Sequence, residues 1–100
     1  MKEIPDISKW KISKVNTIKK MFCGCKELKE IPDILKWNTI NIVDISYLFD
    51  KCTNLKELID ISKLNFRKDV DIRNIFKDCI KLDNLKKYKL LNKMQNKKKD

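Results

Sequence analysis

The stretch FCGCKELKEIPDILKW, residues 22–37, recurs as FDKCTNLKELIDISKL, residues 49–64, and more weakly as FKDCIKLDNLKKYKLL, residues 76–91. Each copy is displaced from the previous one by 27 residues. The displacement aligns three phenylalanines and three cysteines, which are Phe22, Phe49, Phe76, Cys25, Cys52 and Cys79. An internal period of about 20 to 50 residues indicates a repeat protein whose units pack against their neighbours. The fold is therefore predicted from the 27-residue repeat as a whole and not segment by segment.

Each unit combines two apolar spacings. Ile18, Met21, Phe22 and Cys25 lie at offsets of zero, three, four and seven, which is typical of one face of a short helix. Leucines and isoleucines near residues 28–32 precede a Pro-Asp pair, which favours a brief strand followed by a turn. We therefore predict an α/β repeat, a solenoid of about three 27-residue coils that each contain a short parallel strand and a short helix.

The repeat also sets the predicted domain organisation. The units span residues 4–30, 31–57 and 58–84, and a partial fourth unit spans 85–91, so the solenoid is expected to occupy residues 1–91. Residues 92–100 are predicted to be a basic C-terminal tail. The net charge is +10, and residues 85–100 alone hold seven lysines and one aspartate. Most of the excess charge therefore belongs to the C-terminal end.

The cysteines are expected to be free thiols. Cys25, Cys52 and Cys79 share one repeat position on the predicted helical side. Neighbouring helices pack about 8 to 10 Å apart, whereas a disulfide needs α-carbons within about 7 Å. These three residues are predicted to lie reduced in the core. Cys23 is predicted to be exposed, since the equivalent positions hold Asp50 and Lys77.

Three further sets of residues, one acidic and two aromatic, are considered for contact with a ligand or a partner. Asp6, Asp33 and Asp60 share one repeat position and would either hold calcium or a basic ligand, or accept hydrogen bonds within their own turns. The structural interpretation is favoured. Trp10 and Trp37 are predicted to pack at a corner of each coil. Tyr47 and Tyr88 are the aromatic residues predicted to be available for contact.

The amino-acid composition gives little support for an enzyme. The chain has no histidine and a single glycine, so it offers neither the ordinary base for a serine or cysteine nucleophile nor a glycine-rich phosphate loop. We expect no enzyme activity, no cofactor and no metal.

The unit IPDILKWNTINIVDISYLFDKCTNLKE, residues 31–57, resembles the BspA-like leucine-rich repeats of bacterial surface proteins, mycoplasma lipoproteins and amoebal surface antigens. The matching residues are Pro32, Asp33, Trp37, Asn38, Thr39, Phe49, Cys52 and Leu55. The resemblance implies a short leucine-rich-repeat solenoid, a cell-surface location and an adhesive role with a protein partner. Residues 1 to about 91 are covered by it.

We therefore predict a protein-binding module, expected to be a monomer, that presents rows of side chains to a protein partner. The predicted partner-binding residues are Lys29, Glu30, Asp33, Lys56, Glu57, Asp60, Asp83 and Asn84. The alternative is an intracellular protein that binds nucleic acid or another polyanion, without sequence specificity, through its lysine-rich C-terminal tail.

The expected cellular location is inferred from the distribution of apolar residues along the chain. No segment approaches the roughly 18 uninterrupted apolar residues of a membrane span, and MKEIPDISKW lacks the apolar region of a secretion signal. The chain as it stands is expected to have no membrane span and to remain cytoplasmic, whereas the resemblance suggests the cell surface.

Overall fold

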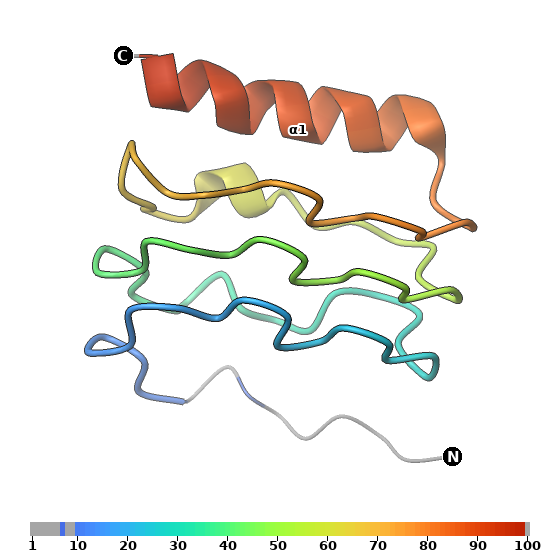
Figure 1. Cartoon of the computed structure of the whole chain (residues 1–100), viewed down its shortest axis with the longest axis horizontal. Coiled ribbons are helices and arrows are strands. Elements are labelled where there is room, and N and C mark those ends of the chain that lie inside the picture. Colours follow the sequence, from blue (N-terminus) through green and yellow to red (C-terminus); the bar gives the residue numbers. More distant parts are fainter. Residues whose placement is uncertain (1–6, 8–9, 100) are drawn as a thin grey trace.

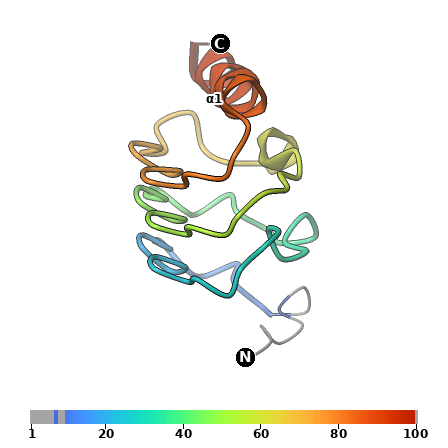
Figure 2. The same ribbon diagram turned by 90° about the vertical axis from the view of Figure 1, so that its right-hand side faces the viewer.

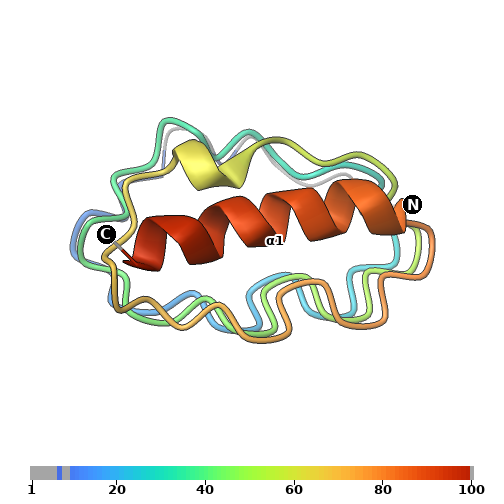
Figure 3. The same cartoon turned by 90° about the horizontal axis from the view of Figure 1, so that it is seen from above.

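The computed structural model describes residue 7 and residues 10–99 of the chain. In this part, the backbone winds through a stack of irregular coils, and one helix lies across the last of them (Figure 1 and Figure 2). Seen from above, successive coils follow nearly the same outline (Figure 3). Residues 1–6 and 8–9, which include Asp6 of the predicted aspartate set, lie outside the described residues.

The predicted α/β leucine-rich-repeat solenoid is wrong. Within the described residues, the regular elements are the 3₁₀-helix η1, Ile61–Lys63, and the α-helix α1, Asn84–Lys99, with no strand or sheet. Parallel pairing is limited to three isolated bridges, Thr17 with Asp44, Asp44 with Asp71, and Glu30 with Glu57. The coils therefore contain neither the short parallel strands nor the short helices that we predicted.

Residues 18–25 form a series of tight turns in place of the predicted helix. The N–H of Met21 donates to the carbonyl of Ile18 at 3.0 Å, three residues back. The N–H of Phe22 instead donates across the stack to the carbonyl of Leu48, also at 3.0 Å. An α-helix needs N–H groups bonded four residues back along the same segment. Because alternate N–H groups bond to the next coil, the helix cannot form.

This alternation places two positions of every coil in the left-handed backbone region. Lys20, Tyr47 and Asn74 share the first position, with φ values of 60°, 59° and 56°. Gly24, Lys51 and Asp78 share the second, with φ values of 75°, 60° and 59°. Only one of the six is glycine, the residue that adopts positive φ most easily. The hydrogen bonds between coils therefore outweigh the local preference of the other five residues.

The core is a column of equivalent side chains. The ring of Phe49 is stacked between those of Phe22 and Phe76, with centroids 5.4 and 5.7 Å apart and interplanar angles of 4° and 6°. Beside it, the Cys52 thiol donates to the carbonyl of Phe22 at 3.0 Å, and the Cys79 thiol donates to that of Phe49 at 2.9 Å. The 27-residue register inferred from the sequence is thus present in the stacked coils.

The corner tryptophans differ from each other. Trp37 is buried, and its indole N–H donates to the carbonyl of Ile7 at 2.8 Å. Trp10 stacks on Trp37 with ring centroids 6.4 Å apart, but 46% of its surface is exposed. The predicted corner packing is confirmed for Trp37 and only partly for Trp10.

The helix α1 covers the open top of the third coil (Figure 1 and Figure 3). Its buried residues, Leu90 and Met94, belong to the hydrophobic core, and Leu91 packs against that core. These residues lie three or four positions apart, which places them on one face of a helix. Residues 85–91 and 92–99, predicted to be a partial coil and a tail, are therefore parts of a single helix.

The third coil differs from the others at one corner. In the second coil the N–H of Ile42 donates to the carbonyl of Thr39, whereas in the third the N–H of Val70 donates to that of Arg67. The turn has moved by one residue, because a displacement of 27 from Ile42 would end at Asp69. Val70 consequently fills the core, and Asp69 is exposed and pairs with Arg67.

Candidate functional site

Four of the predicted binding residues form a surface that we name the charged edge: Lys29, Glu30, Lys56 and Glu57. All four are exposed. The N–H of Lys56 donates to the carbonyl of Lys29 at 2.9 Å, and Glu30 forms a parallel bridge with Glu57. These backbone contacts hold lysine beside lysine and glutamate beside glutamate. Within the described part of the chain, no ion pair neutralises these four side chains.

Asp33 and Asp60, also predicted as binding residues, stabilise their own turns. An Asp33 carboxylate oxygen accepts from the N–H of Leu35 at 3.4 Å. Asp60 caps η1, accepting from the N–H of Ser62 at 3.1 Å and also from the Ser62 hydroxyl. The hydroxyl hydrogen bond is the main cause that lowers the pKa of Asp60 below its ordinary 3.8, and Lys93, 3.4 Å away, lowers it further. Their contacts match the structural interpretation of the aspartate set.

Asp83 directly precedes α1, and Asn84 is the first residue of this helix. The Asp83 carboxylate accepts from the N–H groups of Leu85 and Lys86 at 2.8 and 3.4 Å. Aspartate is among the preferred residues at helix N-termini because it satisfies N–H groups that lack partners within the helix. The structure therefore does not continue the charged edge into the third coil.

All four cysteines are free. Cys52 and Cys79 are buried, Cys25 is partly buried, and Cys23 is exposed, as predicted. Asp50, expected to face solvent, is instead buried, with the Cys23 thiol 3.8 Å from one of its oxygens. Burial raises the pKa of the Cys52 thiol from 9.0 to about 12, and it also raises the pKa values of Cys25 and Cys79.

This difference predicts selective alkylation. Iodoacetamide at pH 8 should modify Cys23 first, whereas Cys52 and Cys79 should react only after urea unfolding, because the thiolate is the reactive form and burial suppresses it. Mass spectrometry of the digested protein identifies the modified residue. Rapid modification of Cys52 in the folded chain would contradict the buried column.

The same burial predicts a loss of stability in alkali. The unfolded Cys52 thiol loses its proton near pH 9, whereas the folded thiol keeps it to about pH 12. The unfolded state therefore binds fewer protons over this interval, and the contribution of Cys52 to the free energy of unfolding falls as the pH rises through it. Urea titrations between pH 8 and 10.5 should show this decline, and a flat profile would count against it.

Tyr47 is less available than predicted. It is partly buried, and the ammonium groups of Lys20 and Lys77 lie 5.8 and 6.0 Å from its ring centroid. The Asn74 amide donates to its hydroxyl at 3.0 Å. Tyr88, by contrast, is 66% exposed on the outer side of α1. Tyr88 therefore remains the better aromatic contact candidate.

The helix α1 is strongly basic. It contains seven lysines and no acidic residue. Lys93 forms an ion pair with Asp60, and Lys97 donates to the carbonyl of Ser62. Lys93 and Lys97, which the sequence assigned to a tail, thus belong to a helix that is fixed to the third coil. Only the helical spacing of Leu90, Leu91 and Met94 could have indicated this from the sequence.

Cavities flank this helix on the third coil. One of about 260 Å³ is lined by basic and apolar residues that include Arg67, Lys68 and Lys97. Another of about 340 Å³ is lined by residues that include Arg73, Lys77 and Lys87. None of these residues was among the predicted partner-binding residues, and only Lys97 belonged to the predicted basic tail, because the cavities depend on α1 lying over the third coil.

The described residues contain neither a metal-binding cluster nor a membrane-spanning helix. The part of the chain that the structure describes has no group of three or more cysteine, aspartate or glutamate residues suited to hold a metal ion. Among the same residues, no helix has the length and apolar character needed to cross a membrane.

A family model described as "Mycoplasma protein of unknown function, DUF285" matches residues 1–99. Comparison with curated proteins and with solved structures gives no match. The family description assigns neither leucine-rich repeats nor BspA-like repeats, so that resemblance stays a prediction.

Proposed function

The chain belongs to the DUF285 family of Mycoplasma proteins, and we propose that it is a protein-binding module whose contact surface is the charged edge. The main support is the pairing of like charges at an exposed, hydrogen-bonded position. Lys29 and Lys56 follow each other across one pair of coils, as do Glu30 and Glu57. Like charges a few ångströms apart repel by about 1 kcal/mol even at the dielectric constant of water.

A protein partner with the opposite charge pattern would relieve this repulsion. Complementary charges across an interface contribute to specificity and to the association rate. The backbone bonds between the coils fix the spacing of the four side chains, so little conformational entropy of the backbone is lost on binding. The resemblance of residues 31–57 to BspA-like repeats extends the proposal to adhesion at a cell surface.

The test is a double charge reversal, Lys29→Glu with Lys56→Glu. We expect this variant to bind the partner at least about tenfold more weakly, since like charges juxtaposed across an interface cost several kcal/mol. Affinity capture from the source cells, read by quantitative mass spectrometry, identifies proteins retained by the wild-type chain and lost by the variant. The matched control is Lys14→Glu with Lys26→Glu, which makes the same charge change at exposed positions of the first coil. Equal capture by both variants would contradict the proposal.

A second candidate function is nonspecific polyanion binding by α1. It is favoured by the seven lysines and the absence of acidic residues in this helix. Removing residues 92–100 would not test it cleanly, because Met94 belongs to the core. Lys86→Gln with Lys89→Gln changes exposed side chains only. If α1 binds polyanions, this variant should bind double-stranded DNA more weakly and with a smaller salt dependence, whereas capture through the charged edge should be unaffected.

A further inference from the structure

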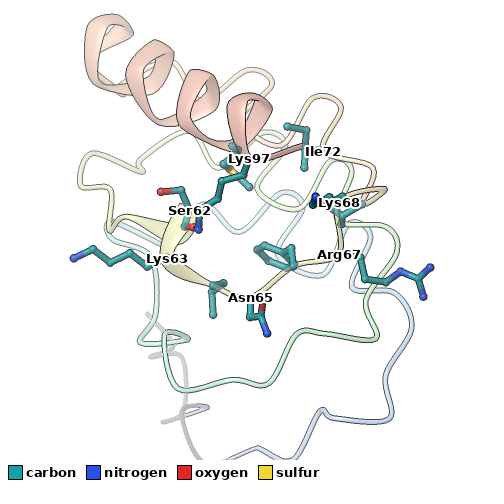
Figure 4. A pocket seen from close by; sticks show the side chains of 11 residues that line it. Ser62, Lys63, Asn65, Arg67, Lys68, Ile72 and Lys97 are labelled. Carbon is teal, nitrogen blue, oxygen red and sulfur yellow. The ribbon is translucent and has the colours of Figure 1, made fainter. Parts of the chain in front are cut away.

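A cavity of about 260 Å³ lies beside the C-terminal half of α1 (Figure 4). We name it the Lys97 pocket. Its apolar lining includes Phe66, Ile72 and Met94, and its polar lining includes Ser62. The volume of this cavity lies just below the usual range of about 300 to 1,000 Å³ for small-molecule sites, so the pocket suits a small ligand.

The charged residues that line the Lys97 pocket are all basic: Lys63, Arg67, Lys68 and Lys97. The Arg67 guanidinium already donates to both carboxylate oxygens of Asp69, at 2.9 and 3.1 Å. Figure 4 shows the side chains of Lys63 and Arg67 extending to opposite sides, away from the cavity. Lys68 and Lys97 are therefore the two cations available to a ligand inside it.

The Lys97 pocket forms where the third coil meets α1, at the end of the stack of coils. The corner turn of the third coil falls one residue late, which brings Lys68 and Val70 into the lining. The helix α1 then crosses this coil and adds Met94 and Lys97 from above. Lys97 is held in place by donating to the carbonyl of Ser62. Lys68 and Lys97, from separate segments, thus line one cavity together with apolar side chains.

We propose that the Lys97 pocket binds a phosphate monoester carried on a small apolar body. A dianion matches two ammonium groups, and lysine binds phosphate as a compact point charge. Phe66, Ile72 and Met94 would cover the apolar body, which favours an organic ester over inorganic phosphate. The phosphate would come from a free metabolite or from a lipid headgroup. This site is separate from the charged edge and does not depend on the proposed protein binding.

The test uses phenyl phosphate as the probe and the full-length chain. Two-dimensional NMR spectra should show saturable shifts of the Met94 methyl and Phe66 ring signals during titration. Inorganic phosphate should bind at least about tenfold more weakly, because it lacks the apolar ring that the pocket would bury. Vesicles of phosphatidic acid in phosphatidylcholine, compared with phosphatidylcholine alone, test the lipid source. Binding to phenyl phosphate, to the phosphatidic acid vesicles or to both supports the site.

Single lysine substitutions test which basic side chains bind the phosphate group. Lys68→Gln and Lys97→Gln should each weaken phenyl phosphate binding about tenfold, since each removes a charge-assisted hydrogen bond. Lys14→Gln is the matched control and should change the affinity by less than about twofold, because Lys14 is exposed on the first coil and does not line the pocket. The proposal is overturned if no probe binds, if inorganic phosphate binds as tightly as phenyl phosphate, or if Lys14→Gln weakens binding as much as Lys68→Gln.

Discussion

Phe49→Ala should lower the free energy of unfolding by about 3 to 5 kcal/mol, the usual cost of removing a buried phenyl ring. Phe49 has no exposed surface and is stacked on both faces. Its loss therefore leaves a cavity at the centre of the column and removes both ring contacts. Urea unfolding monitored by circular dichroism measures the change. Because domains of this size are stable by roughly 5 to 15 kcal/mol, the variant should lose a large part of its stability and unfold at a clearly lower urea concentration than the wild-type chain.

Ile80→Ala provides the control for Phe49→Ala. Ile80 is 76% exposed, and surface substitutions usually change the free energy of unfolding by no more than about 0.5 kcal/mol. A hydrophobicity effect unrelated to burial would lower the stability of both variants. Similar, small losses in the two variants would show that Phe49 is not at the centre of the fold.

Leu90→Ala combined with Met94→Ala should lower the free energy of unfolding by about 4 kcal/mol or more, since each buried truncation costs about 2 to 5. Both side chains belong to the core on the inner face of α1. Without them the helix loses its main apolar contacts with the third coil. Thermal and urea unfolding should detect the loss, and the helical circular dichroism signal should fall at temperatures where the wild-type chain is folded.

The matched control for this pair lies on the same helix. Leu85 and Tyr88 are 59% and 66% exposed, so Leu85→Ala with Tyr88→Ala should have a small effect. Both pairs carry two alanines in α1 and so have similar effects on helix propensity. If the outer pair destabilised the chain as much as the inner pair, α1 would not cover the coils through Leu90 and Met94.

The period of the stack could be predicted from the sequence, and its secondary structure could not. Equal spacing of Phe22, Phe49 and Phe76 requires equal positions in successive coils, whatever the backbone between them does. The spacing of Ile18, Phe22 and Cys25 is compatible both with a helix and with alternating tight turns, because each arrangement turns these residues toward the core. Which one forms depends on where the N–H groups donate, and the apolar pattern contains no information about that.

The C-terminal end shows a second limit of prediction from sequence. Lysines dominate residues 85–99, and composition alone favoured a solvated tail. The apolar residues Leu90, Leu91 and Met94 have helical spacing, but their burial depends on the open top of the third coil. The charged edge was predictable because Lys29, Glu30, Lys56 and Glu57 repeat by position. The Lys97 pocket was not, since it depends on a turn shifted by one residue and on the placement of α1.

The register of the coils is most directly tested by nuclear Overhauser effects between phenylalanine rings in solution. Ring centroids 5.4 and 5.7 Å apart predict strong cross-peaks from Phe49 to Phe22 and from Phe49 to Phe76. No direct cross-peak is expected between Phe22 and Phe76, because the Phe49 ring lies between them. Selective labelling of phenylalanine, with Phe49→Leu used for assignment, makes the measurement specific. A folded chain in which Phe49 contacts neither ring would contradict the stacked arrangement of the coils.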